Sequence, residues 1–265
     1  MVVYICNPCV VVHSFQIELT DDKIKGLMIA IGLSVVVHMV LIIGSEILSF
    51  IFHFNSIEKA SIIYTNAGYL VIPLVGAVLG EEWVFYTTAF ILVQTVLMWT
   101  HGVKLIGQEK ELNIRKILCN PNVIAMIIGI ALFALEIRLP TVVDSCVSGF
   151  GDMISPASMM VIGMVIGDVD LKWVFRQKRP YLICLLRLIV FPLIAVVAFA
   201  GLERSGIHPD AEYILMIVLI ATSAPAAAMI TQLAQIYGKD SRYASVINVM
   251  SVIFCIITMP VMVLS

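Results

Sequence analysis

Charged residues are scarce in this sequence, and their scarcity excludes most classes of soluble protein. Asp, Glu, Lys and Arg make up 13% of the chain, whereas hydrophobic residues make up 61% and the mean hydropathy is +1.05. So small a polar share cannot coat a soluble globule of 265 residues. The chain also lacks a basic stripe, so we expect no nucleic-acid partner. Apolar runs of membrane-spanning length recur throughout, and they predict an all-α polytopic membrane protein.

Motifs of enzymes and metalloproteins are also missing. The sequence has no Walker loop, no H-E-x-x-H pair and no G-x-S-x-G nucleophile elbow. Its six cysteines lie in or beside apolar segments, which indicates buried thiols rather than a disulfide framework. The C-x-x-C spacing of Cys6 and Cys9 has no second ligand pair. We therefore expect no metal and no cofactor.

One string does match a catalytic motif. Gly149-Phe150-Gly151-Asp152 fits the G-x-G-D sequence of intramembrane aspartyl proteases. That chemistry needs a second carboxylate, supplied by a Tyr-Asp pair on another helix. None of the eight tyrosines is followed by aspartate, so an intramembrane enzyme is the weaker alternative.

The apolar runs divide the chain into nine candidate spans joined by short connections, which leaves no soluble domain. We place the spans at about 1–17, 25–52, 57–80, 82–106, 120–138, 141–167, 179–202, 210–236 and 240–264.

Lysine and arginine are distributed unevenly between alternate connections. One alternate set holds eleven of them, and the other set holds four. The eleven are Lys59, Lys104, Lys110, Arg115, Lys116, Lys172, Arg176, Lys178, Arg179, Lys239 and Arg242. Because positive loops stay on the cytoplasmic side, this set is predicted to be cytoplasmic and the C-terminus to face outside a cell membrane.

Two pairs of spans match each other in opposite orientation. The third and eighth spans both contain a break before a terminal glycine, at Gly80 and Gly238. The first and sixth spans also match, because Asn7-Pro8 precedes an aspartate at nearly the spacing of Ser155-Pro156. An inverted repeat is typical of secondary transporters. We predict repeats of five helices at 1–106 and 120–265 with a cytoplasmic connecting loop at 107–119. The first copy is shorter by about one helix, so we expect either a lost first span or a mis-assigned start codon.

Residues that break helices lie within the third and eighth spans. Asn66 and Pro73 interrupt one, and Ser223 and Pro225 interrupt the other. A helix broken inside a bilayer exposes N–H and C=O groups, which is tolerated only where the break is buried in protein or lines a wet cavity. The N-terminal ends of half-helices attract anions. We therefore predict that both spans are broken, that the breaks meet at mid-membrane, and that a small organic anion binds there.

Further polar residues extend this prediction. Arg187 lies within a span, where it could pair with a substrate carboxylate, gate the pathway or hold a carbonyl or acid. Asp152 could carry a coupling proton if it is buried, or it could lie at a wet edge. Gln94 and Asn248 could contact the substrate or bridge helices. The predicted substrate-binding residues are Asn7, Thr65, Asn66, Gly68, Pro73, Gln94, Ser223, Pro225, Ala226 and Asn248, and the charge or coupling candidates are Arg187 and Asp152.

Several stretches resemble the auxin efflux carrier family, which includes plant auxin exporters and prokaryotic malate and malonate permeases. They are TNAGYLVIPL, WTHG, NPNVIAMIIGIAL, SPASMMVIGMVIG, RLIVFPL and SAPAAAMITQLAQIYGKD. The resemblance covers essentially the whole chain except the first of the family's ten helices. It implies a scaffold made by the first two helices of each repeat, a mobile unit made by the other three, and an elevator mechanism. It places the family's crossover residues on Asn66, Pro73 and Pro225. The short connection at 107–119 favours a prokaryotic permease.

These observations predict a transporter of malate or another small dicarboxylate. Its expected partners are the lipid bilayer, the organic anion, a coupling ion (a proton or sodium) and a second copy of the chain. A truncated carrier without transport activity is the alternative.

Overall fold

The computed structural model describes residues 2–18, 20–107, 118–167, 170–203 and 209–263. The described residues form helices and contain no β-strand, only one isolated bridge between two loops. This arrangement confirms the prediction of an all-α polytopic membrane protein.

Four helical spans are long and apolar enough to cross a membrane. The first is α2 (Asp21–Phe52) and the last is α16 (Ser241–Val263). The other two are composite and include short π-helical turns. One consists of η3 (Glu81–Trp83), α5 (Val84–Leu97), η4 (Met98–Gly102) and α6 (Val103–Gly107). The other consists of α12 (Arg179–Leu185), η5 (Leu186–Val190) and α13 (Phe191–Glu203).

The remaining unbroken helices are shorter. They are η1 (Val2–Cys6) continuing into α1 (Asn7–Ser14), α8 (Pro121–Ala134), α9 (Thr141–Asp152), α10 (Ile154–Gly167) and α11 (Leu171–Arg176). The sixth predicted span is thus interrupted at Met153, between α9 and α10. The short helix α11 was not predicted, because its six residues lie among the charges of a connection.

The third and eighth predicted spans are both broken, as expected. The third consists of α3 (Ser56–Ile63), then residues 64–66, then η2 (Ala67–Val71) and α4 (Ile72–Val78). The eighth consists of α14 (Ala211–Ser223), then residues 224–227, then α15 (Ala228–Ile236).

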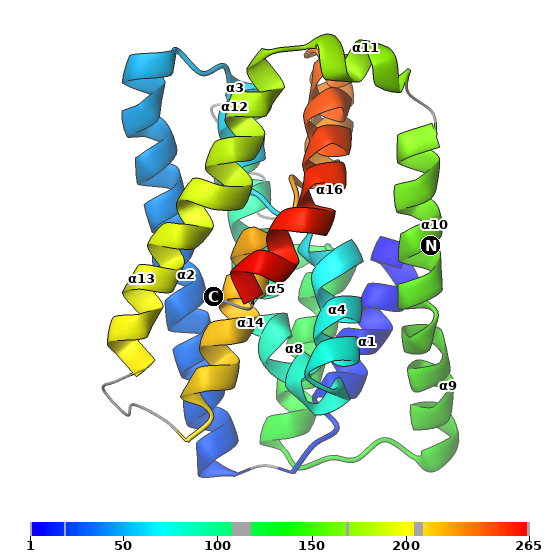
Figure 1. The fold of residues 1–265 in the computed structure, drawn as a ribbon. Helices are drawn as coiled ribbons and strands as arrows, with labels where there is room; N and C mark the ends of the chain where they lie inside the picture. Colours follow the sequence, from blue (N-terminus) through cyan, green and yellow to red (C-terminus); the bar gives the residue numbers. More distant parts are fainter. Residues whose placement is uncertain (1, 19, 108–117, 168–169, 204–208, 264–265) are drawn as a thin grey trace.

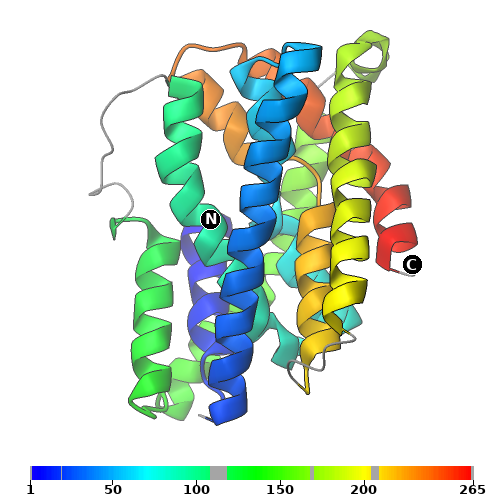
Figure 2. The same cartoon turned by 90° about the vertical axis from the view of Figure 1, so that its left-hand side faces the viewer.

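The helices form two groups (Figure 1). Helices α1, α8 and α9 pack together on one side, with α10 above α9. Helices α2, α12, α13, α14 and α16 lie on the other side, and α2 contacts both α5 and α14. The first broken span links the two groups, because α3 contacts α2 whereas η2 and α4 contact α10. Figure 2, turned by 90°, shows α14 alongside α13 in one half of the molecule, where α14 contacts both α13 and α2.

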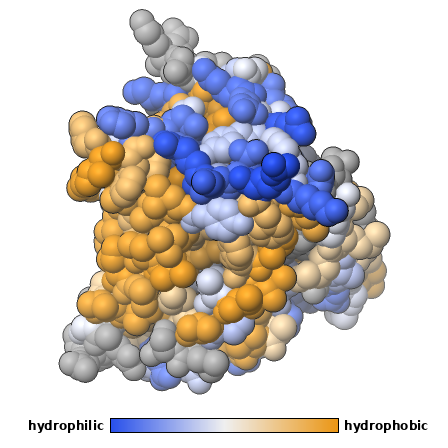
Figure 3. Space-filling view, turned by 45° about the horizontal axis from the view of Figure 1, so that its top comes forward, coloured by the Kyte–Doolittle hydropathy of each residue, from blue (hydrophilic) through white to orange (hydrophobic). Residues whose placement is uncertain are grey.

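The outer surface has a hydrophobic side wall and a hydrophilic end (Figure 3). The hydrophilic end contains α11 and the start of α16, where Lys172, Arg176, Lys178 and Arg242 are exposed. The guanidinium of Arg242 lies 4.0 Å from the centroid of the Trp173 ring. All four basic residues belong to the connections predicted to be cytoplasmic.

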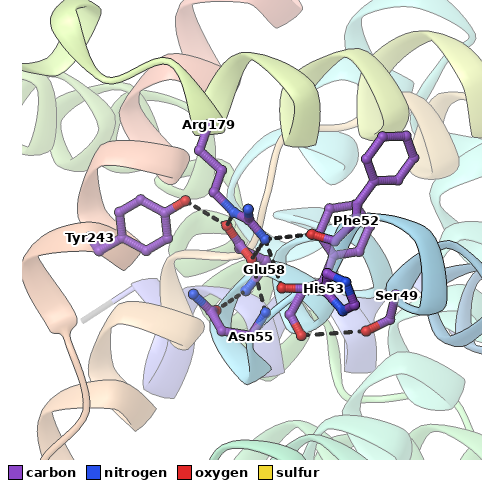
Figure 4. A network of polar contacts seen from close by, with 8 residues as sticks. Ser49, Phe52, His53, Asn55, Glu58, Arg179 and Tyr243 are labelled. Carbon is purple, nitrogen blue, oxygen red and sulfur yellow. Dashed lines mark hydrogen bonds and ion pairs between the residues drawn. The ribbon is translucent and has the colours of Figure 1, made fainter.

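A buried carboxylate fastens α3 to its neighbours at this end (Figure 4). Glu58 is fully buried and accepts hydrogen bonds from Arg179 of α12 and from Tyr243 of α16, the latter at 2.7 Å. Arg179 also donates to the carbonyls of Phe52 and His53, which close the turn after α2. The network therefore joins helices from both halves of the chain. The repeat boundaries stay a prediction, and residues 108–117 of the predicted connecting loop lie outside the described residues.

Candidate functional site

The two breaks cross and bind each other through their backbones. Thr65 lies opposite Ala226 in an antiparallel bridge. The Asn66 amide donates to the Pro225 carbonyl at 2.8 Å, and the Ala227 amide donates to the Tyr64 carbonyl at 3.0 Å. The N–H and C=O groups of the two bridging residues point away from the facing segment in this type of pair. They therefore need partners elsewhere, because an unpaired buried backbone group is costly.

A glutamine supplies both partners for the first break. The Gln94 side chain, from α5, accepts from the Thr65 amide at 2.9 Å and donates to the Thr65 carbonyl at 2.8 Å. A carboxamide can do both at once because it has a donor and an acceptor on one planar group. The side-chain amide of Gln94 thus binds the backbone of the break. This agrees with the second of its two predicted roles, a bridge between helices, rather than with direct substrate contact.

Two residues of α16 do the same for the second break. Asn248 donates to the Ala226 carbonyl at 2.6 Å, and the Ser251 hydroxyl accepts from the Ala226 amide at 3.0 Å. The two breaks are therefore held by equivalent contacts from different helices. Asn248 was a predicted site residue, whereas Ser251 was missed because a serine within an apolar helix gives no signal by itself.

A cavity of about 90 Å³ lies beside the crossing. Five carboxamide residues from four parts of the chain line it, together with small and aromatic residues. The five are Asn7, Asn66, Gln94, Asn120 and Asn122. None of the described residues that line it carries a charge. The cavity thus offers neutral donors and acceptors in a largely buried setting.

The N-terminal ends of two half-helices open on this cavity. Gly68 and Tyr69 belong to the first turn of η2, and Ala228 and Met229 belong to the first turn of α15. First-turn amides have no intrahelical acceptor, and the helix dipole makes this end partly positive. Both ends therefore favour a negatively charged group in the cavity.

In the first break, the side chain of Asn66 remains available to bind a ligand in the cavity. Its backbone binds Pro225, but its amide side chain has no hydrogen bond to the described part of the chain. Gly68 lies next to the Asn7 side chain, and a Cβ atom at Gly68 would lie 2.5 Å from Asn7 Nδ2. The absence of a side chain at Gly68 therefore lets α1 approach the break.

Sequence reasoning missed Asn120 and Asn122, which line the cavity from the start of α8. A signal was present, because Asn120-Pro121 repeats the Asn7-Pro8 pair of α1. Asn120-Pro121 lies at the start of α8, where proline is tolerated, and Asn7-Pro8 lies at the junction of η1 with α1. The side-chain oxygens of Asn7 and Asn122 are buried and have no hydrogen-bond partner among the described residues.

Tyr64 was also missed. Its ring is fully buried, its hydroxyl donates to the Leu97 carbonyl at 3.0 Å, and the same oxygen lies 2.8 Å from His101 Nδ1. Its backbone carbonyl accepts from Ala227, so Tyr64 connects the break to η4. Nothing in the sequence around Tyr64 distinguished it from other aromatic residues of the spans.

Two predicted site residues lie in a different cavity. Pro73 and Asp152 line a space of about 390 Å³ between α1, α4 and α9, together with Glu81, Glu82 and Asp144. Asp152 is exposed at the end of α9, which agrees with the second of the two alternatives, an acid at a solvent-accessible edge, and not with a buried acid. Because α9 ends at Asp152, the carboxyl group lies at a solvent-accessible edge of this larger cavity.

The other predicted residues lie at the crossing but outside the cavity lining. Ser223, the last residue of α14, and Pro225, in the second break, are both buried, and Ala226 forms the bridge. Arg187, in η5, is fully buried and donates from Nη1 to the Ile62 carbonyl at 3.1 Å. The structure therefore brings Asn7, Thr65, Asn66, Gly68 and Gln94 together around one cavity and places Arg187 behind it.

A protein-family model matches this chain. The family described as Membrane transport protein matches residues 1–263, which is nearly the whole chain. No curated protein matches the chain. The match spans both breaks, the cavity and the residues that hold the crossing.

Proposed function

Because this chain belongs to the membrane transport protein family, the family of the auxin efflux carriers, we propose that it is a secondary transporter of a small organic anion. The observation that carries the proposal is the neutral cavity at the crossing of the two broken helices. Two half-helix N-termini open on it, and no carboxylate among its described lining residues repels an anion.

We infer that the anion is a dicarboxylate such as malate. Carboxamides donate through N–H₂ to carboxylates and accept through oxygen from hydroxyl groups, so a hydroxy acid matches both functions. A cavity of about 90 Å³ suits a ligand of a few carbon atoms better than an indole acid. The family resemblance to malate and malonate permeases points the same way.

The neutrality of the cavity suits a carrier that must release its ligand. A fixed charge would be costly to bury when the site is empty and would bind an anion too tightly. Neutral donors and helix dipoles supply attraction without that cost. Asn66, with its free side chain, is the proposed direct contact.

We propose that transport follows an elevator mechanism. The scaffold would consist of α1, α8, α9 and α10, and the mobile unit would contain the other spans and both breaks. The cavity is consistent with this division, because Asn7 and Asn122 come from the scaffold and Asn66 and Gln94 from the mobile unit. We also propose a cell-membrane orientation with α11 in the cytoplasm and the C-terminus outside, from the basic residues around α11.

The test is flux in liposomes that contain the purified protein. Labelled malate, malonate, succinate and indole-3-acetate are offered in parallel, and empty liposomes give the background. We expect malate flux well above background and above that of indole-3-acetate. Background flux for every carboxylate, in a sample that remains folded by thermal denaturation, would refute the proposal and favour a carrier without transport activity.

A further inference from the structure

Arg187 carries a buried charge that the proposed substrate site does not use. It lies in η5, in the middle of the span from Arg179 to Phe199, and none of its surface is exposed. Nη1 donates to the Ile62 carbonyl, whereas Nε and Nη2 have no partner among the described residues. The ion pairs found among those residues do not include Arg187. An unpaired buried cation weakens folding, so its presence calls for a functional reason.

Arg187 lies at the C-terminal end of the half-helix α3, and this position suggests its function. Ile62 belongs to the last turn of α3, and the carbonyls of a last turn have no intrahelical donors. They make the C-terminal end of a helix equivalent to roughly half a negative charge. The guanidinium therefore binds the negative end of the half-helix that stops at the first break.

The second half-helix ends in the same region. The η5 turn contacts α14 as well as α3. The carbonyl of Ser223, the last residue of α14, accepts from the Cys255 thiol at 3.7 Å, and that thiol is within electrostatic range of Arg187. Arg187 thus lies near both negative ends, while both positive ends open on the cavity.

In transporters with broken helices, the C-terminal ends of half-helices and the unwound carbonyls coordinate coupling cations. We propose that Arg187 is a built-in counter-cation of the crossing, in the place of a coupling metal ion. Its charge offsets the negative half-helix ends, so the positive ends dominate the field in the anion cavity. Arg187 is therefore a positioning and electrostatic residue that does not touch the substrate. This inference rests on the proposed anion transport.

The first experiment measures the counter-cation site without transport. Arg187→Gly opens a space beside the Ile62 carbonyl, and free guanidinium at millimolar concentration should bind there and raise the thermal midpoint of the variant. Urea, a neutral molecule of the same shape, should not. The matched control is Leu188→Gly, which removes an adjacent, almost fully buried side chain but no charge. Stabilisation by urea equal to that by guanidinium, or an equal guanidinium effect on Leu188→Gly, would overturn the assignment.

The second experiment measures flux in liposomes. Wild-type flux should stay within about twofold when sodium and potassium are replaced by choline. Arg187→Met should lower flux per folded molecule at least about tenfold, because the half-helix ends lose their counter-charge. Arg187→Lys keeps the charge and should retain more flux than Arg187→Met. If Arg187→Met transports at the wild-type rate, or if wild-type flux requires sodium, the counter-cation role is wrong.

The two experiments separate this inference from the proposed function. Absence of carboxylate flux in the wild type would refute anion transport, yet the guanidinium-dependent shift of Arg187→Gly would still report on the counter-cation site. Should Arg187→Gly fail to fold, rescue of its folding by guanidinium in the purification buffer replaces the thermal shift. Failure of that rescue, together with equal flux of Arg187→Lys and Arg187→Met, would overturn the inference.

Discussion

The amide of Asn66 donates a hydrogen bond of 2.8 Å to the carbonyl of Pro225, a residue 159 positions later in the chain. The contact joins two broken helices at the points where each helix stops. Pro225 has no N–H to donate and takes part through its carbonyl, and the side chain of Asn66 stays available to the cavity. The backbone of Asn66 therefore holds the crossing together, whereas its side chain is available to the ligand, so substitutions of the side chain should affect transport more than folding.

Asn66→Ala should abolish most transport and leave the protein folded. The substitution removes the side chain that lines the cavity but keeps the backbone bond to Pro225. Loss of one hydrogen bond to a charged ligand costs roughly 1.5–3 kcal/mol, or about ten- to a hundredfold in affinity. Malate flux and the malate-induced thermal shift measure the effect. A folded variant with parental flux would show that Asn66 only fills space.

Gln94→Leu should destabilise the protein more than it changes ligand affinity per folded molecule. It leaves the N–H and C=O of Thr65 without partners, and each unsatisfied buried group costs about 1–3 kcal/mol. Asn248→Leu is the matched comparison. It should cost less, because Ser251 still accepts from the Ala226 amide. Thermal midpoints in detergent test the order, and an equal or reversed order would contradict this assignment.

Gly68→Ala should reduce transport by displacing Asn7. The new Cβ would lie 2.5 Å from Asn7 Nδ2, so the Asn7 side chain must move away from the break. The control is Gly32→Ala in α2, where nothing lies within 4 Å of the added atom. There the change should be neutral or stabilise by up to about 1 kcal/mol through helix propensity. Equal flux in both variants would mean that Asn7 is not needed where it lies.

Tyr243→Phe should lower the free energy of unfolding by about 1.5–3 kcal/mol, the typical range for a hydrogen bond to a charged group. The hydroxyl donates to the fully buried carboxylate of Glu58, which then keeps Arg179 and the Asn55 amide as donors. Tyr181→Phe is the control, because its hydroxyl donates to the Phe175 carbonyl at an exposed position. Midpoints of thermal denaturation that shift equally in the two variants would argue against a special role for the network.

The orientation of the chain can be tested at Cys119. This cysteine is exposed and follows the basic connection that is predicted to be cytoplasmic. A membrane-impermeant maleimide should therefore label it in inverted vesicles and not in intact cells. Cys146, which is also exposed, and Cys9, which is partly exposed, are replaced by serine for this measurement so that only Cys119 is followed. Labelling of Cys119 from outside intact cells would reverse the proposed topology.

Much of the fold was predictable because its strongest determinants are local. Each apolar run predicted a span, and residues such as Asn66 and Pro225 predicted where two spans break, since helices stop where the backbone cannot continue its hydrogen bonds. The interruption at Met153 was not predicted, because the run from 141 to 167 is apolar on both sides of it. The short helix α11 was not predicted either, because charged residues surround its six residues and no apolar run marks it.

The sequence by itself therefore determined the all-α membrane class and the positions of the two breaks. Only the tertiary structure decided which groups satisfy those breaks. Gln94 and Asn248 bind backbone, Arg187 lies behind the crossing, and Asp152 lies at a wet edge. The physical reason is distance along the chain. A helix boundary depends on a few neighbouring residues, whereas a hydrogen bond such as that of Gln94 to Thr65 depends on how two helices pack.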